Sequence, residues 1–176
     1  MITGNPGVGK TTLLLRLNEY LEEKYLINGF YTEEIRHSGQ RTGFNITTFS
    51  GIERILASVD MKSRYRVGRY GVSVTNVNEI INDIIQSAIV PEIWLIDEIG
   101  KMESFSNLFR FFIEKILEEK TPVITTIAKS AGGWISQIRQ RRDVKLLELT
   151  VQNREQLFHD FIQKIFLNQV QDTRKI

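Results

Sequence analysis

Apolar residues recur along this chain with two different spacings, which predict different elements. A period of three to four residues places apolar side chains on one face of a helix. Short apolar runs at 1–3, 93–96, 122–127 and 144–149 are typical of strands buried in a sheet. The helical period is carried by Leu13, Leu14, Leu17 and Leu21; by Val77, Ile80, Ile81, Ile84, Ile85 and Ala88; by Phe105, Leu108, Phe109, Phe112, Ile113, Ile116 and Leu117; and by Leu157, Phe158, Phe161, Ile162 and Ile165. This alternation predicts an α/β fold with a mostly parallel central sheet and helices on both faces.

Residues 29–58 depart from this alternation. The segments 29–32, 44–49 and 52–56 are rich in β-branched and aromatic residues, and turns at 37–43 and 50–51 separate them. We interpret the region as an antiparallel β insertion at one side of the sheet. We expect residues 1–176 to form one domain, with Thr150 as the N-cap of the closing helix and a frayed tail after Leu167.

A glycine-rich segment joins the first short strand to the first helix, which we expect at about 10–24. Its residues, Gly4-Asn5-Pro6-Gly7-Val8-Gly9-Lys10-Thr11, fit the pattern G-x-x-x-x-G-K-[ST] of a phosphate-binding loop. The glycines let backbone N–H groups face an anion, and the helix N-terminus adds positive potential. We expect Lys10 to reach the β- and γ-phosphates, Thr11 to bind Mg²⁺, and Thr12 to cap the helix or touch the α-phosphate. The alternative is a plain glycine turn, against which the preceding strand argues.

Two carboxylates end the apolar run at 93–96. Because α/β sheets bind ligands at the carboxyl ends of their strands, Asp97 and Glu98 are expected at such a ligand site. Asp97 is suited to hold Mg²⁺ through water, and Glu98 to orient and polarise an attacking water. Two acidic residues at a strand end are common by chance, so the combination with the phosphate loop gives the motif its specificity.

Other positive side chains lack a comparable motif. A basic, aromatic and glycine-rich segment at 62–71 either faces a substrate or is a solvated loop, since charge runs are commonly surface features. The candidates for a further phosphate or base contact are Arg36, Arg66, Arg69, Lys101 and Arg139.

Composition excludes several classes of site. The chain has no cysteine, which excludes disulfides and thiolate chemistry, and its two histidines disfavour a histidine-rich metal site. Lys and Arg total 23 against 21 for Asp and Glu, and this net charge of +2 does not favour a nucleic-acid partner by itself. No apolar run approaches the roughly 18 residues of a membrane span. The phosphate loop begins at residue 4 and leaves no room for a signal peptide, so we expect a monomeric, cytoplasmic protein without a membrane partner.

Taken together, the motifs resemble those of one family, the THEP-type nucleoside-triphosphatases of thermophiles and their animal relatives called cancer-related nucleoside-triphosphatases. Besides the phosphate loop, the resemblance rests on GFYTEEIR at 29–36, RTGF at 41–44, RVGRYGV at 66–72, DEIGKME at 97–103, and Thr150 with Asn153-Arg154. It implies a RecA-like P-loop core and Mg²⁺-dependent hydrolysis of several nucleoside triphosphates, ATP and GTP among them. Two departures are a short first strand and the sequence SAGG at 130–133, where relatives often carry a His-Pro pair. The second departure questions a base contact from that loop.

The expected reaction is in-line attack of water on the γ-phosphorus, in which Lys10 and Mg²⁺ neutralise developing charge and Glu98 positions the water. Without a further well-placed cation, turnover should be slow, on the order of 10⁻² s⁻¹ or below. One rival is a nucleoside or nucleotide kinase, for which 64–69 is the nearest candidate for a lid. Another is a nucleic-acid-stimulated ATPase, to which Arg139, Arg141 and Arg142 point. A nucleotide-binding switch without turnover is a third, and Glu98 argues against it.

Overall fold

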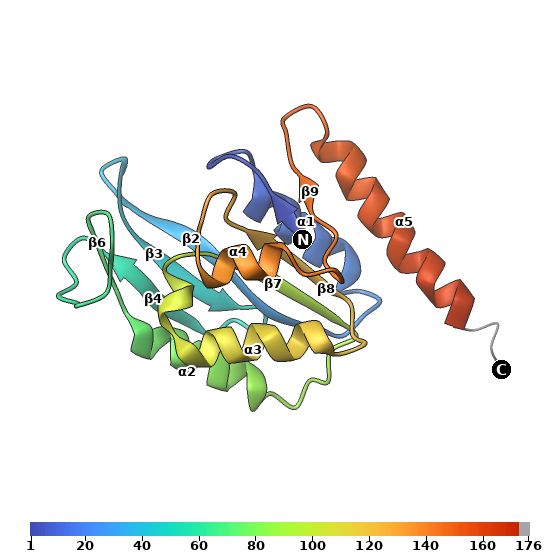
Figure 1. Cartoon of the computed structure of the whole chain (residues 1–176), viewed down its shortest axis with the longest axis horizontal. Helices are drawn as coiled ribbons and strands as arrows, with labels where there is room; N and C mark the ends of the chain where they lie inside the picture. Colours follow the sequence, from blue (N-terminus) through green and yellow to red (C-terminus); the bar gives the residue numbers. More distant parts are fainter. Residues whose placement is uncertain (173–176) are drawn as a thin grey trace.

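The computed structural model describes residues 1–172, and one sheet of nine strands runs through this range (Figure 1). The strands are β1 (Ile2–Thr3), β2 (Ile27–His37), β3 (Gln40–Thr48), β4 (Glu53–Ser58), β5 (Arg66–Val67), β6 (Tyr70–Val72), β7 (Ile93–Ile99), β8 (Val123–Ile127) and β9 (Leu147–Glu148). Their order across the sheet is β5-β6-β4-β3-β2-β7-β8-β1-β9.

The sheet divides into two parts at β2. On one side, β2, β7, β8, β1 and β9 pair in parallel; on the other, β2, β3, β4, β6 and β5 pair antiparallel. Among the described residues the two kinds of pairing are equal in number, so the sheet as a whole is mixed, and β7, β8, β1 and β9, which lie outside residues 29–58, pair in parallel. Hairpins cause the difference, because β3, β4, β6 and β5 extend the sheet beyond β2. Residues 29–58, where we predict antiparallel strands, form most of β2 together with β3 and β4.

Helices cover both faces of the sheet, as predicted (Figure 1). The helices are α1 (Lys10–Leu21), α2 (Val74–Ile85), α3 (Asn107–Glu118), α4 (Trp134–Arg139) and α5 (Arg154–Asp172), with a 3₁₀ turn, η1 (Glu103–Phe105). Apolar residues of α2, α3 and α4 belong to the core on one face, and those of α1 and α5 to the core on the other. None of the helices within residues 1–172 is long and apolar enough to span a membrane.

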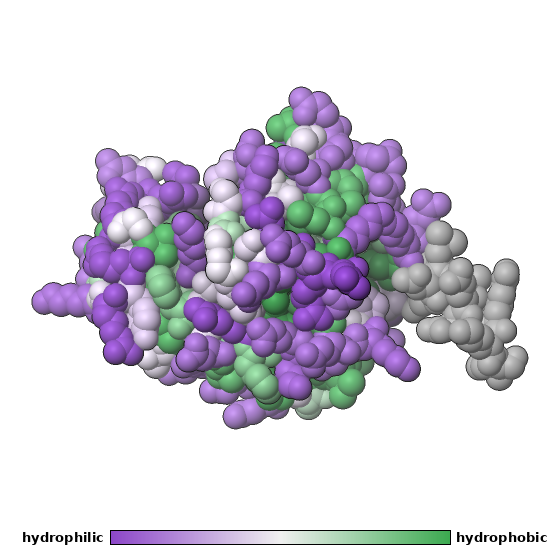
Figure 2. Space-filling view, in the orientation of Figure 1, coloured by the Kyte–Doolittle hydropathy of each residue, from purple (hydrophilic) through white to green (hydrophobic). Residues whose placement is uncertain are grey.

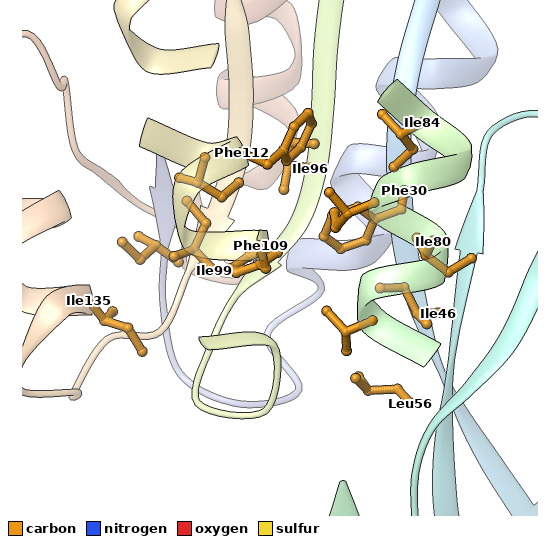
Figure 3. Packing of buried hydrophobic residues seen from close by; sticks show 14 of the residues in the cluster. Phe30, Ile46, Leu56, Ile80, Ile84, Ile96, Ile99, Phe109, Phe112 and Ile135 are labelled. Carbon is orange, nitrogen blue, oxygen red and sulfur yellow. The ribbon is translucent and has the colours of Figure 1, made fainter. Parts of the chain in front are cut away.

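Strand β7 explains why two cores form. Successive side chains of a strand point to opposite faces, and every residue from Ile93 to Ile96 is buried. Trp94 and Ile96 join the core beneath α2 and α3, while Ile93 and Leu95 join the core beneath α1. Figure 3 shows the first of these cores, where Ile80 and Ile84 from α2 and Phe109 and Phe112 from α3 surround Phe30 and Ile96.

Gly29 allows β2 and β7 to approach closely. A Cβ atom at Gly29 would lie 1.8 Å from the Leu95 carbonyl oxygen, and the Gly29 φ of 137° is one that other residues rarely adopt. Gly29 therefore sets the spacing of the two strands at the boundary between the two parts of the sheet.

The closing helix begins later than predicted. The Asn153 carbonyl accepts the first helical bond, from Leu157 N at 2.9 Å, so Asn153 is the residue that precedes the helix. Thr150 instead exchanges two hydrogen bonds with Asn153, and its prediction as the N-cap is wrong. Helix α5 continues to Asp172, past the predicted fraying point at Leu167, and the tail at 173–176 lies outside the described residues.

Candidate active site

The loop at residues 4–9 joins β1 to α1 and contains a turn in which Val8 N donates to the Asn5 carbonyl at 3.3 Å. Gly7 and Gly9 have φ angles of 75° and 96°, in the left-handed region that glycine adopts without strain. Gly9 immediately precedes α1, and no side chain caps that end of the helix. The first-turn N–H groups are thus available to an anion, as a phosphate-binding loop requires.

Lys10 lies over this loop. Its Nζ donates to the Gly4 carbonyl at 3.3 Å and to the Asn5 carbonyl at 3.4 Å. A second lysine, Lys129, contacts the same loop, because its Nζ lies 3.4 Å from Asn5 Oδ1 and 2.5 Å from Glu148 Oε1. We did not predict a role for Lys129, since its place beside the loop depends on the long-range packing of β8 next to β1.

Asp97 collects hydrogen bonds from three elements, although it is only 1% exposed. Its Oδ2 accepts from the hydroxyls of Thr11 at 2.7 Å and Thr32 at 3.1 Å, and its Oδ1 accepts from the Thr126 hydroxyl at 2.5 Å. These threonines belong to α1, β2 and β8. The carboxylate therefore fixes the start of α1 against the central strands.

The donor set fits a divalent cation of the magnesium type. Thr11 Oγ1 and Asp97 Oδ2 are oxygen atoms 2.7 Å apart at the edge of the phosphate loop. Within the described part of the chain, no group of three His, Cys, Asp or Glu side chains is placed to hold a metal. A magnesium ion in a phosphate site takes one or two protein oxygens, with water and substrate phosphate as its other ligands, and these two oxygens fit that requirement.

Glu98 and Glu103 lie together on the side of β7 that faces η1. A Cβ atom at Gly100 would lie 2.7 Å from Glu103 Oε2 and 3.3 Å from Glu98 Cδ, so the two carboxyl groups meet around this glycine. Burial raises the pKa of Glu98, the charge of Asp97 raises it further, and Lys10 opposes the rise. Burial and the charge of Glu98 raise the pKa of Glu103 well above its ordinary value.

These carboxyl groups border a cavity of about 250 Å³ that we call the inner cavity. Thr32, Glu98 and Glu103 line it, together with Lys101 and Val67. Because Thr32 also binds Asp97, the inner cavity adjoins the carboxylate that holds Thr11. Figure 2 shows a notch in the outline between the phosphate loop and the part that carries the β2–β3 hairpin.

The predicted cations are not gathered at the phosphate loop. The Arg36 guanidinium pairs with Glu34, and Arg69 donates to the Arg41 carbonyl. Arg36 lies four residues beyond Thr32 along β2, about 13 Å at the rise of a strand. Arg139 donates to the Lys129 carbonyl, which places it beside the loop at 129–133. Arg66 and Lys101 line a second cavity, described below.

A main-chain phosphate loop, a hydroxyl at the start of its helix and a carboxylate at a strand end define a P-loop NTPase. Comparison with known proteins agrees with this class. A family model described as NTPase matches residues 1–162. The chain therefore belongs to this NTPase family, in agreement with the predicted resemblance.

Named relatives match over nearly the whole chain. Nucleoside-triphosphatase THEP1 of Thermotoga sp. (strain RQ2) is 41% identical over 169 residues, which cover 96% of this chain and 95% of that protein. The Cancer-related nucleoside-triphosphatase of Homo sapiens is 36% identical, over 92% of this chain and 93% of the human protein. The crystal structure of THEP1 from Aquifex aeolicus superposes with a TM-score of 0.79 at 37% identity, covering 91% of this chain and 94% of that one. The solution structure of the human protein superposes with a TM-score of 0.78 at 35% identity, covering 93% of this chain and 95% of the human one.

Proposed function

We propose that this protein hydrolyses nucleoside triphosphates to the diphosphate and phosphate, with Mg²⁺ as cofactor. The observation that carries the proposal is the contact of Thr11 Oγ1 with Asp97 Oδ2 at 2.7 Å, beside the phosphate loop. This contact joins a phosphate site to two oxygen ligands suited to a hard cation. Family membership and the names of the relatives support the same reaction.

In the proposed mechanism, residues 4–9 hold the phosphates with backbone N–H groups, and Lys10 leaves its carbonyl partners to bind the β- and γ-phosphate oxygens. Thr11 and Asp97 would hold Mg²⁺, and the ion would supply positive charge at the phosphate oxygens. Glu98 orients a water for in-line attack, and its raised pKa makes it a better proton acceptor than an ordinary carboxylate. Positioning and electrostatics thus carry the catalysis.

Broad base specificity and slow turnover belong to the same proposal. A loop that binds the phosphates with backbone N–H groups makes no contact that distinguishes the base of ATP from that of GTP. Arg36 and Arg69 are engaged elsewhere and Lys129 is paired with Glu148, so Lys10 is the cation that the phosphate loop itself supplies to the γ-phosphate. We also propose that residues 1–176 form one domain with a RecA-like core, which the single sheet across residues 1–172 supports.

The test is phosphate release from ATP, GTP, CTP and UTP at varied Mg²⁺, for the parent chain, Lys10→Ala and Glu98→Gln. We expect release from all four substrates and a loss of at least about a hundredfold in each variant. Arg142→Gln, a change of surface charge outside these contacts, serves as the matched control and should keep parental activity. Unchanged phosphate release in Glu98→Gln would contradict the role of this residue in the mechanism. Unchanged phosphate release in Lys10→Ala would contradict the role of the phosphate loop.

A kinase reaction is the second candidate, because a larger cavity borders the inner cavity. Product that forms only when a nucleoside or a nucleoside monophosphate is added would favour transfer over hydrolysis. The same four substrates, assayed with and without these acceptors, separate the two reactions.

A further inference from the structure

A second cavity, of about 570 Å³, opens beside the inner cavity, and we call it the outer cavity. Its wall is built from the β5–β6 turn, η1, the first turn of α3 and the loop that precedes α4. Val67 and Lys101 line both cavities, so the two spaces adjoin. Its volume lies within the range of small-molecule binding sites, about 300–1,000 Å³.

The charged residues that line the outer cavity are all cations. They are Arg66, Lys101 and Arg110, and no carboxylate belongs to the lining. Within residues 1–172, none of the three forms an ion pair. Elsewhere the structure pairs Arg16, Arg36, Arg41, Arg54 and Arg141 with carboxylates. Three unpaired cations around one space favour an anionic ligand.

An aromatic wall accompanies these cations. Trp134 lines the outer cavity, and its indole is held in place because Nε1 donates to Glu114 Oε1 and the ring packs edge-on against Phe109 at 6.0 Å. The Arg110 guanidinium lies 5.9 Å from the centre of the Trp134 ring. Phe105 contributes a second ring to the lining. A rigid indole beside cations suits a flat ring that carries a phosphate.

The position of the outer cavity separates it from the triphosphate site. No residue of the phosphate loop lines it, and Glu98 lies between the two in the inner cavity. In the proposed function, on which this step rests, Glu98 faces the γ-phosphate, so the base of the bound triphosphate points away from Glu98. The outer cavity therefore faces the terminal phosphate and does not serve the base of the same nucleotide.

We propose that the outer cavity binds a second ligand, a nucleoside monophosphate, in front of the γ-phosphate of the first. Its phosphate contacts Lys101 and Arg110, and its base packs against Trp134. Cations line the outer cavity, whereas the acidic side chains of Glu98 and Glu103 line the inner cavity, and this difference orients the ligand with its phosphate toward the outer cations.

The test is calorimetric titration with AMP, GMP, CMP and UMP while the phosphate loop is saturated with Mg²⁺ and a non-hydrolysable triphosphate, β,γ-imido-ATP. We expect one site per chain for at least one monophosphate, and weaker binding of its nucleoside and of ribose 5-phosphate, each of which lacks half of the recognised chemistry. Arg110→Met and Lys101→Met should each weaken binding about tenfold. Lys115→Met is the matched control on α3, because Lys115 lies outside the lining and should leave binding unchanged.

Arg110 also donates to the Ser104 carbonyl, so thermal unfolding of Arg110→Met must be measured to check that the variant is folded. Lys101 is exposed, so a change of binding in Lys101→Met reports on the lost charge alone. Absence of saturable monophosphate binding, competition with the triphosphate analogue, or unchanged binding in Lys101→Met overturns the proposal. Repeating the titration in Lys10→Ala separates the two hypotheses. If the parent chain fails to bind the triphosphate analogue, the proposed function fails, while monophosphate binding that is lost in Lys101→Met still supports the cavity.

Discussion

The parallel and antiparallel parts of the sheet differ in how they use polar side chains. In the parallel part, Asp97 is buried and accepts bonds from threonines on three elements. In the antiparallel part, Glu34 is exposed and pairs with Arg36 and Arg41 on the β2–β3 hairpin. The arginines beside it lower the pKa of Glu34. Parallel strands bring their carboxyl ends to one edge, where residues distant in sequence converge, whereas hairpins pair residues that are near in sequence.

Asp97→Asn gives the largest expected effect, because it breaks the convergence in the parallel part. The amide has one acceptor oxygen in place of two and no charge for a cation. We expect kcat/KM for ATP to fall by about 10²–10³ and the Mg²⁺ dependence to weaken. Asp60→Asn, an exposed acid after β4, is the control and should keep the parental rate. A loss below about threefold would contradict the role of Asp97.

Gly29→Ala tests the boundary between the two parts. The added methyl group would lie 1.8 Å from the Leu95 carbonyl oxygen, which forces β2 and β7 apart. We expect the free energy of unfolding in urea to fall by roughly 2–3 kcal/mol. Gly39→Ala is the matched control, since Gly39 also has a positive φ, 78°, but a methyl group added there would have no atom within 4 Å. Equal losses in the two variants would show that backbone strain, and not the strand contact, is responsible.

Glu103→Gln probes the buried acid beside Glu98. Folding raises the pKa of Glu103, so the folded chain binds this proton more tightly than the unfolded chain does. Stability therefore falls as pH rises from about 4.3, the ordinary pKa of Glu, toward the folded value. Glutamine has no ionisable carboxyl group, so its burial does not lower stability as pH rises. We expect the free energy of unfolding of the variant to exceed that of the parent by on the order of 1 kcal/mol at pH 7 and by much less at pH 4. The measurement is urea unfolding at both pH values, and a gain independent of pH would refute the explanation.

Arg36→Ala gives the smallest expected effect and tests the antiparallel part alone. Its guanidinium is exposed and pairs with Glu34, so we expect a loss of stability below about 0.5 kcal/mol and an unchanged kcat/KM. Thermal unfolding and the phosphate-release assay measure the two quantities. A tenfold fall in kcat/KM would place Arg36 at the phosphates. It would also show that the antiparallel part of the sheet contributes to the active site.

Patterns within one segment predicted the phosphate loop, the helices and strand β7. Each rests on local spacing, such as glycines before a lysine or four apolar residues in a row. The contacts of Thr32 and Thr126 with Asp97 were not predicted, because threonine is common in strands and its partner lies far away in sequence. The partners of Arg36 and Arg69 were not predicted either, for a related reason. A long side chain at a known backbone position still has many possible partners, and Glu34 and the Arg41 carbonyl are chosen only by the folded hairpins.

Strand β1, which carries the phosphate loop, has a consequence for the order of events during synthesis. Of the nine strands within residues 1–172 it is synthesised first, yet its partners are β8 and β9, through the pairs Ile2 with Thr126 and Ile2 with Leu147. The hairpins of the antiparallel part, whose partners are adjacent along the chain, can form while translation continues. The nucleotide site is therefore seated only after β9 has emerged, although the phosphate-loop motif is synthesised well over a hundred residues before it.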